Sequence, residues 1–506
     1  MKNDILRELI EKKEKIRRMV GEEGIEKQHG LAKLTARERI ENLLDPGSFV
    51  ELSIFTKSNS DLQAENVITG YGTINRRPVA VFAQEFALLD GTVGEAHGLK
   101  IANLFEFAMK LGIPIVGLYD SRGPRIQDGI GALRGFGEIF YRSSLASGLV
   151  PQISAILGPC IGPTALASVL ADFVIMSKNP NCHLFINPPH IIRAVFEEEI
   201  TEYELGGWQA QAYRSGNCHI VAEDDLTALR LIRELLNYLP LNCLEDPPKV
   251  EVSDPPSRLT PEISETVPED PMEPYDMREI VKKVLDDGKF FEISENFASN
   301  VVTGFGRIDG KTVGIVANNP RSLAGCLDIN GCDKITRFVR FCDSFNIPII
   351  TFVDVPGFLP GIDQEFGGII RAGARLVSAY AEATVPMITL IVRRAYGGAY
   401  VAMGSKHIGA DLVFAYPSAE ISVMGPEGAV ETIYRDEIER AEDKVRMREM
   451  KVREYLEKFA NPYNSAERGY VDDIIDPKFT RIKLISSLRI LESKRKKPPA
   501  KKHSTK

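Results

Sequence analysis

Cysteine is scarce in this chain and never occurs in the spacing of a redox or metal-binding pair. Seven cysteines occur among 506 residues, and no two of them form a CxxC pair. This absence argues against a zinc ribbon or a redox dithiol. An odd number of cysteines in a long chain is typical of reduced thiols, which predicts a cytoplasmic protein. The seven are Cys160, Cys182, Cys218, Cys243, Cys326, Cys332 and Cys342.

Long apolar runs and several enzyme motifs are also missing. No run of 18 or more apolar residues occurs, so we expect no transmembrane helix. The amphipathic first twenty residues lack the apolar core of a signal peptide. The seven histidines show no HExxH spacing, which predicts no metal site in this chain. Neither a P-loop nor a GxSxG motif at a strand-to-helix turn occurs, so no such ATP site or serine nucleophile is expected.

Positive charge is concentrated at one end of an acidic chain. The formal net charge is −8, although the stretch 494–506 carries seven Lys or Arg and no acid. The remaining body is therefore more acidic still, and we expect no nucleic-acid binding. The tail is predicted to be a disordered, solvated extension, with a docking segment for an acidic partner as the alternative.

A proline-rich stretch divides the chain nearly in half. Eight of the thirty prolines lie between Glu245 and Pro274. Proline fixes φ and removes an amide donor, so this stretch predicts an extended connector without helices or strands. The predicted organisation is a domain over 1–246, a connector over 247–274, a domain over 275–493 and the basic tail over 494–506.

The two halves repeat each other. VITGYGTIN from Val67 aligns with VVTGFGRID from Val301, an offset of 234 residues. The same offset places Asp120 on Asp354, and one slipped residue later aligns Gly162 with Gly397. A register kept over more than fifty residues indicates an internal duplication.

Each half alternates apolar runs with helical spacing. In both halves a Pro-led apolar run ends in an Asp-bearing loop, and a third run ends in a Gly-rich turn that opens a helix. This alternation predicts an α/β fold with largely parallel strands. Backbone amides become accessible to a ligand at such strand-to-helix turns.

The turn from Arg394 to Tyr400 is the sharpest local feature. Its Gly397-Gly398-Ala399 sequence leaves N–H groups unblocked, which favours an oxyanion hole. Tight helix packing that requires small residues is the alternative interpretation. In the equivalent turn of the first half, Pro163 has no N–H to donate.

Two other features have an open or unfavourable interpretation. Arg122 and Arg125 follow Asp120 and could meet a phosphate or carboxylate, or could be solvated loop charges. The tetrapeptide Glu449–Val452 is similar to a biotin attachment sequence, but its charged helical surroundings argue against biotinylation.

These motifs resemble the carboxyltransferase (β) subunits of biotin-dependent acyl-CoA carboxylases, especially the propionyl-CoA type. The resemblance spans most of the chain and is most specific in the second half. The shared stretches are Ala324–Asn330, Arg337–Asp343, Phe352–Gly361, Gly367–Arg371, Ala395–Tyr400 and Glu457–Pro462, with Ala36–Arg39, Asp45–Gly47 and Leu205–Gly207 in the first half.

The resemblance implies two tandem crotonase-like (ClpP/crotonase) domains in a homohexamer, a trimer of dimers. The first domain would bind acyl-CoA, and the second would bind carboxybiotin. Separate biotin carboxylase and biotin carboxyl carrier subunits are implied, and no metal. Carboxyl transfer would run through CO2 and a thioester enolate, with amides holding two oxyanions.

The resemblance also implies roles for individual residues. Gly398 and Ala399 would hold the biotin ureido oxygen, and Gly162 with its neighbour Pro163 the thioester oxygen. Further cofactor-binding positions are Tyr396, Gly397, Val401, Gly357 and Phe358. Implied substrate-binding positions are Ser121, Gly123, Arg125, Gly325, Cys326 and Asp328.

Three departures from the family pattern affect the predicted substrate. Arg122 and Pro124 interrupt a loop that is close to Ser-Gly-Gly-Ala-Arg in the family, and Pro163 replaces the second glycine of a Gly-Gly pair. Val401 stands where propionyl-type members often carry an acid, which predicts a changed or more apolar acyl pocket.

Two alternatives therefore stay open: a methylmalonyl-CoA-type decarboxylase subunit and a non-catalytic ring scaffold. A crotonase-type hydratase is disfavoured, because no pair of acids stands at the Gly-rich turns.

Overall fold

The computed structural model describes residues 2–18, 20–58, 63–270, 273–494, 496–497 and 499–502. The chain divides into two compact units, Met1–Glu245 and Asp246–Lys506. This division falls one residue before the boundary that the sequence predicts. Within the described ranges, no helix is both long and apolar enough to cross a membrane.

The first unit is built on an eight-stranded sheet in the order β1-β2-β3-β4-β5-β6-β8, with β7 beside β5. Strands β1 to β3 pair antiparallel, and from β3 onward the pairing is parallel. The central strands β4 and β5 are almost entirely buried, as expected for parallel strands covered on both faces. The strands are β1 (Val50–Leu52), β2 (Val67–Ile74), β3 (Arg77–Gln84), β4 (Ile115–Ser121), β5 (Gln152–Ile161), β6 (Phe173–Ser177), β7 (His183–Phe185) and β8 (Ile220–Ala222).

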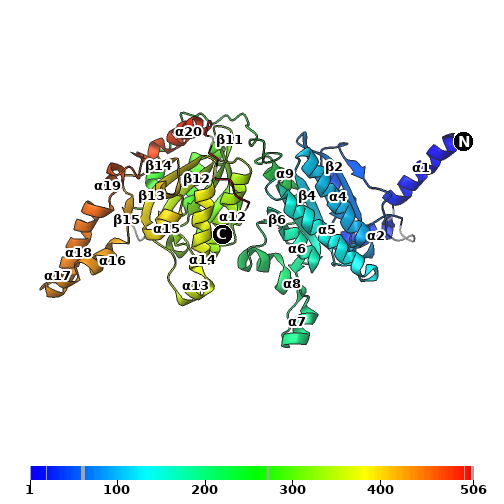
Figure 1. The fold of residues 1–506 in the computed structure, drawn as a ribbon, viewed down its shortest axis with the longest axis horizontal. Coiled ribbons are helices and arrows are strands. Elements are labelled where there is room, and N and C mark those ends of the chain that lie inside the picture. The colour runs from blue at the N-terminus through cyan, green and yellow to red at the C-terminus, as the bar shows by residue number, and fades with distance from the viewer. Residues whose placement is uncertain are drawn as a thin grey trace. The chain divides into compact units, whose positions relative to one another are not determined.

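Helices cover this sheet, and α4 packs along α5 (Figure 1). Helix α4 carries its apolar residues at helical spacing and buries Ile101, Leu104, Phe105 and Ala108. The helices are α1 (Lys2–Arg17), α2 (Gly21–Gly30), α3 (Ala36–Leu43), α4 (Glu95–Leu111), α5 (Ile130–Ala146), α6 (Pro163–Val169), α7 (Pro189–Phe196), α8 (Glu202–Gly206) and α9 (Asp225–Leu236).

The second unit repeats this plan, so the predicted duplication is present in the fold. Its eight-stranded sheet has the order β16-β14-β13-β12-β11-β10-β9, with β15 beside β13. Strands β10, β11 and β12 start and end exactly 234 residues after β2, β3 and β4. The strands are β9 (Phe290–Ile293), β10 (Val301–Ile308), β11 (Lys311–Asn318), β12 (Ile349–Val355), β13 (Met387–Tyr396), β14 (Leu412–Ala415), β15 (Glu420–Ser422) and β16 (Asp473–Ile474).

The helices of the second unit include a group that packs on itself beyond the sheet. Buried Val430, Ile438 and Tyr455 form a small core among α16, α17 and α18. The helices are α10 (Ile263–Thr266), α11 (Met277–Val284), α12 (Ile329–Ser344), α13 (Ile362–Gly367), α14 (Ile369–Glu382), α15 (Gly397–Ala402), α16 (Pro426–Ile433), α17 (Arg435–Arg440), α18 (Lys444–Tyr455), α19 (Pro462–Glu467) and α20 (Thr480–Leu491).

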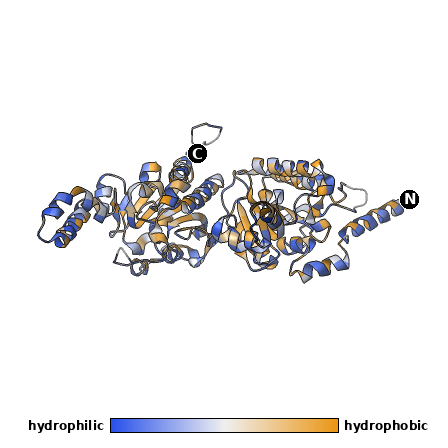
Figure 2. Ribbon diagram, turned by 90° about the horizontal axis from the view of Figure 1, so that it is seen from below, coloured by the Kyte–Doolittle hydropathy of each residue, from blue (hydrophilic) through white to orange (hydrophobic). Residues whose placement is uncertain are grey.

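Each unit has its own apolar core between sheet and helices. Phe82, Tyr119 and Ile156 lie in the first core, and Ile315 and Phe352 lie in the second. Figure 2 shows that the strands of both sheets are largely apolar. Burying each such side chain contributes roughly 1.5–3 kcal/mol, which makes these cores the main source of stability.

Asp120, next to the last residue of the central strand β4, lies in a buried ionic cluster. Lys33 Nζ lies 2.8 Å from both carboxylate oxygens, and Arg39 Nη1 lies 2.9 Å from Oδ2. All three side chains are fully buried, so each charge depends on its partners. A Cβ at Gly158 would lie 1.9 Å from the Asp120 carboxylate, which explains the glycine on the facing strand.

Asp354 occupies the same place in the second unit with different partners. Arg393 Nε and Arg394 Nε each lie 2.8 Å from one carboxylate oxygen, and the Tyr275 hydroxyl donates at 3.0 Å. Arg393 also donates to the backbone oxygens of Asp270 and Glu273. The buried carboxylate therefore holds the end of the proline-rich stretch against the sheet.

The structure corrects two predictions about irregular segments. The proline-rich stretch is not free of helices, because α10 forms within it and buries Ile263 in the core of the second unit. In the basic tail, Lys494 bonds Asp411, Lys496 bonds the Ala383 carbonyl, and Lys501 bonds Glu382. The described part of the tail therefore lies against the second unit, whereas 495, 498 and 503–506 lie outside the described residues.

Candidate functional site

The two Gly-rich turns have the same backbone shape. Gly162 follows β5 with φ of 61°, and Gly397 follows β13 with φ of 61°. This left-handed conformation is strained for residues with a side chain, so it accounts for glycine at both positions. Each turn leads directly into a short helix, α6 or α15.

The second unit presents two free amides at the start of α15. The N–H groups of Gly398 and Ala399 lie in the first turn, where an α-helix has no internal acceptor. Within the described part of the chain neither amide has a hydrogen-bond partner. The two adjacent donors can therefore hold one oxygen that carries negative charge.

The first unit presents one free amide, and the residue that supplies it differs from those that the sequence suggested. The Gly162 N–H donates to the Phe185 carbonyl at 2.9 Å, and Pro163 has no N–H. The Gly162 N–H is therefore not free to hold a thioester oxygen, and Pro163 cannot donate, as the sequence already shows. The amide of Thr164 is the one without an acceptor among the described residues.

Residues predicted to bind the cofactor gather at the start of α15. Tyr396 and Gly397 form the turn itself, and a Cβ at Gly398 would lie 3.8 Å from the Phe358 ring. The Gly357 carbonyl next to Phe358 accepts from the Leu327 N–H at 3.0 Å. This loop places an aromatic ring beside the free amides. Val401 follows on α15 and is partly exposed.

Arg125 is tied to neighbouring residues of the first unit. Its guanidinium is buried and donates to Glu65 at 2.8 Å, Asn66 at 2.9 Å and the Thr92 carbonyl at 3.1 Å. Arg125 holds the pKa of Glu65 down to about 2, against the opposing effect of burial. These contacts fix the loop after β4, so the predicted substrate contact of Arg125 is not supported.

The other predicted substrate positions also have internal partners. The buried Ser121 hydroxyl accepts from the Gly123 N–H at 3.1 Å. The Gly325 carbonyl accepts from Asn318 at 3.1 Å, and Asp328 caps α12 through the Gly331 N–H at 2.8 Å. Burial raises the pKa of the Cys326 thiol, which keeps it protonated. We infer that these residues shape the loops around the turns.

A buried histidine connects the Arg125 cluster to the sheet. His97 Nδ1 lies 2.7 Å from Asn66 Oδ1, and its Nε2 lies 3.2 Å from Gln84 Nε2. This pattern suits a neutral ring that donates from Nδ1 and accepts at Nε2. Burial lowers the pKa of His97 to about 3.

We expect this histidine to make stability depend on pH. The unfolded chain protonates His97 below about pH 6.5, whereas the folded chain resists protonation until pH 3. Its contribution is complete above pH 6.5 and falls as pH decreases toward 3, by up to about 1.4 kcal/mol per unit. Urea unfolding between pH 7 and pH 4 should show a smaller slope for His97→Gln. An identical slope in both proteins would contradict a neutral buried His97.

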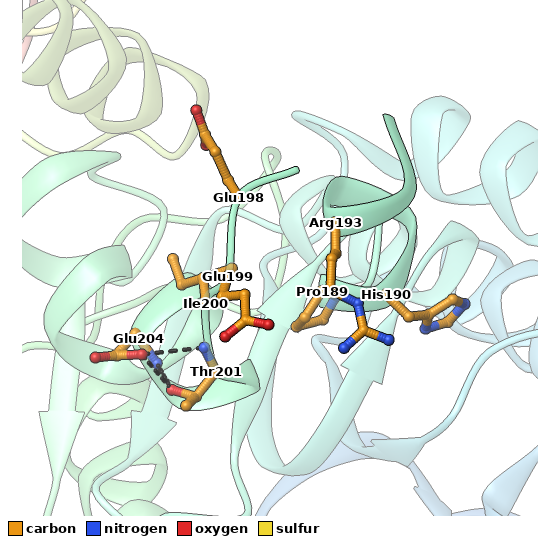
Figure 3. A pocket seen from close by; sticks show the side chains of 8 residues that line it. All are labelled: Pro189, His190, Arg193, Glu198, Glu199, Ile200, Thr201 and Glu204. Atoms are coloured by element: carbon orange, nitrogen blue, oxygen red, sulfur yellow. Dashed lines mark hydrogen bonds between the residues drawn. The ribbon is translucent and has the colours of Figure 1, made fainter. Parts of the chain in front are cut away.

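An open groove in the first unit does not contain the predicted site residues. It has a volume of about 440 Å³ and lies between α7 and α8 (Figure 3). The Glu204 carboxylate in its lining already accepts hydrogen bonds from the Thr201 N–H and hydroxyl, with which it caps α8. Its lining is Pro189, His190, Arg193, Glu198, Glu199, Ile200, Thr201 and Glu204. Its charged lining consists of three glutamates, one arginine and a histidine, so the groove is not a site built for an anion.

Comparison with known proteins identifies the family. The Carboxyl transferase domain model matches residues 27–505. The propionyl-CoA carboxylase carboxyltransferase subunit of Haloferax mediterranei is 52% identical, over 99% of this chain and 98% of that protein. The methylmalonyl-CoA decarboxylase subunit alpha of Propionigenium modestum is 47% identical, over 98% of each chain.

A solved structure supports the same assignment. The crystal structure of transcarboxylase 12S, described as a hexamer with methylmalonyl-coenzyme A and methylmalonic acid bound, matches with a TM-score of 0.96. The two are 46% identical, and the match covers 99% of this chain and 97% of that one. The repeated α/β units are therefore crotonase-like, as predicted, and the molecule is an enzyme of carboxyl transfer. The chain belongs to the carboxyl transferase family.

The sequence analysis did not predict which cations neutralise the buried carboxylates of the two units. Asp120 and Asp354 were aligned with each other, but nothing indicated that Lys33 and Arg39 bind one and Arg393 and Arg394 the other. A carboxylate at the end of an otherwise apolar strand was the available signal, because a buried charge requires a partner.

Proposed function

We propose that this chain moves a carboxyl group between carboxybiotin and the α carbon of a short-chain acyl-CoA of the propionyl- or methylmalonyl-CoA type. The observation that carries this proposal is the pair of free, adjacent amides of Gly398 and Ala399. The names of the relatives, which include a propionyl-CoA carboxylase and a methylmalonyl-CoA decarboxylase, support the substrate class.

The residues at the start of α15 fit a biotin ureido group. Its carbonyl oxygen is a hydrogen-bond acceptor, and the Gly398 and Ala399 amides are two donors that lack an acceptor. Carboxybiotin would supply CO2 at this place. The two amides would stabilise negative charge on the ureido oxygen, and the Phe358 ring beside them would restrict water.

On the acyl side, this chain offers a single amide for the thioester oxygen. Thr164 would donate to the enolate oxygen from its N–H, without the second donor that Pro163 removes. Val401, in place of an acid, favours an apolar acyl group. We infer an acyl site with weaker enolate stabilisation than the biotin side.

Exposed apolar residues support assembly with further copies of the chain. Ile126 and Ile130 are 86% and 82% exposed after β4, and Ile362, Phe366 and Ile370 are 72%, 89% and 77% exposed after β12. Both repeats thus expose apolar side chains at equivalent places, which is typical of an interaction surface. We propose a homohexamer that works with biotin carboxylase and biotin carrier subunits, and light scattering of the purified chain tests the six copies.

The same site chemistry also serves the reverse direction. The decarboxylase relative, at 47% identity, keeps a methylmalonyl-CoA decarboxylase subunit as a second candidate function. Co-purification of the native complex, followed by an acyl-CoA panel with ATP and bicarbonate, distinguishes the two. Carboxylation of an acyl-CoA with ATP would support the carboxylase subunit.

Pro163→Gly tests whether the acyl site is active but short of one donor. The purified chain is incubated with free biotin and methylmalonyl-CoA, and the loss of the carboxyl group is measured. We expect the native chain to decarboxylate slowly and Pro163→Gly to raise kcat by about tenfold, because a second amide becomes able to donate. No turnover by either protein would favour the non-catalytic scaffold. Turnover that Pro163→Gly leaves unchanged would show that this amide does not limit the reaction.

A further inference from the structure

The turn that carries the free amides is held by a side-chain bond from a neighbouring strand. Tyr396 is the last residue of β13 and precedes α15, and it is 6% exposed. Its hydroxyl donates to Glu420 Oε2 on β15. Burial and the Glu420 carboxylate both raise the pKa of Tyr396, so the phenol keeps its proton and the bond persists at neutral pH.

The segment after Glu420 encloses the same turn. Strand β15 pairs in parallel with the end of β13, with Ser422 opposite Tyr396. A Cβ at Gly397 would lie 3.0 Å from the Val423 carbonyl, and a Cβ at Gly425 would lie 3.5 Å from the Tyr396 ring. Residues from 420 to 425 therefore form the support behind the Gly397–Ala399 backbone.

The first unit holds its equivalent turn differently. There Ile161 and His183 stand at the places of Tyr396 and Glu420, and the Gly162 N–H is tied to the Phe185 carbonyl at 2.9 Å. Tyr396 pairs with Ser422 in the same parallel register in which Ile161 pairs with Phe185, so both units support the turn through the neighbouring strand. The second unit adds the Tyr396–Glu420 side-chain bond, which the isoleucine at position 161 cannot form.

We propose that Glu420 is a positioning residue for carboxyl transfer: through Tyr396, it fixes the turn so that the Gly398 and Ala399 amides point at one shared oxygen. This inference rests on the proposed function of those amides. Adjacent donors stabilise an oxyanion only when both are directed at its position, and small misplacements are costly in rate. The bond acts on the direction of the donors.

Substitutions at both ends of the bond test this role. We expect Glu420→Ala and Tyr396→Phe each to lower kcat for biotin-dependent decarboxylation of methylmalonyl-CoA by roughly 10- to 100-fold, with KM for the acyl-CoA changed less than twofold. The double variant should lose no more than either single variant, because both remove one bond. Glu420→Gln keeps an acceptor oxygen and should recover most of the lost rate.

Tyr416→Phe is the matched control. It removes a hydroxyl from another buried tyrosine of the same unit, whose 2.9 Å bond is made to Thr480 Oγ1 on α20 and not to β15 or the turn. A loss of kcat as large in Tyr416→Phe would show a general structural effect and overturn the proposal. Full activity of Tyr396→Phe would also overturn it, even where Glu420→Ala fails to fold. The activity of Gly398→Pro then separates the two proposals. If Tyr396→Phe is fully active and Gly398→Pro is inactive, the proposed function stands without the positioning role. If Gly398→Pro is active, the proposed function itself fails.

Discussion

Replacing Gly398 with proline is expected to lower kcat of biotin-dependent carboxyl transfer by about 10²- to 10³-fold. The substitution removes one of the two free amides at the start of α15, and loss of one oxyanion donor typically costs that much. Proline is tolerated in the first turn of a helix, where the N–H has no internal acceptor. The first unit already shows this arrangement, because Pro163 opens α6. Steady-state decarboxylation of methylmalonyl-CoA with free biotin measures the effect.

Gly398→Ala is the matched control for this loss. Alanine keeps the N–H, and its Cβ would meet the Phe358 ring at 3.8 Å, an ordinary contact distance. We expect Gly398→Ala to lose less than about tenfold, so that the proline effect is assigned to the missing donor. Equal losses in both variants would attribute the effect to crowding beside Phe358 instead.

Asp354→Ala is expected to destabilise the second unit by about 3–5 kcal/mol. The substitution leaves Arg393 and Arg394 buried without their carboxylate, and an uncompensated buried charge is costly. It also removes the acceptor of the Tyr275 hydroxyl, which helps to hold the proline-rich stretch. Because whole domains are stable by only about 5–15 kcal/mol, much of this margin would be lost. Urea unfolding followed by tryptic cleavage within 246–506 measures the change.

A surface carboxylate of the same unit provides the control. Asp473 forms a 2.7 Å ion pair with Lys483, but its side chain is 48% exposed. Removing it should cost less than about 1 kcal/mol, because water replaces the partner. If Asp354→Ala unfolds at the same urea concentration as Asp473→Ala, the buried cluster does not hold the unit together.

Much of the fold could be predicted from local patterns and the repeat. The offset of 234 residues between Val67 and Val301 is also the offset between strands β2 and β10. In both repeats this strand pairs antiparallel with the strand that follows it. The connector was only partly predictable. Its prolines indicate extended chain, yet Ile263 gains enough from burial in the core to form a short helix between them.

The free amides of the candidate site could be predicted in the second unit and less well in the first. The small residues Gly397, Gly398 and Ala399 at a strand-to-helix turn predict accessible amides without knowledge of distant contacts. In the first unit, whether Gly162 can donate depends on its bond to Phe185, which is more than twenty residues away and pairs only when β7 joins β5. Local sequence therefore could not show that Thr164 carries the free amide.

The ionic partners of Asp120 and Asp354 could not be predicted either, because they come from different parts of the chain in the two units. The cations of Asp120 come from the N-terminal segment, 81 and 87 residues away, whereas those of Asp354 come from the adjacent strand β13. The duplication preserved the carboxylate and replaced its partners. Similarity between the halves consequently predicts the aspartates and not what neutralises them.

A crystal structure of the assembled chain with biotin tests the central claim most directly. We expect the ureido oxygen to lie 2.7–3.1 Å from the backbone nitrogens of both Gly398 and Ala399, the distance required of oxyanion donors. A well-defined biotin whose ureido oxygen is bound by other groups, with these two amides turned toward protein acceptors, would contradict the account.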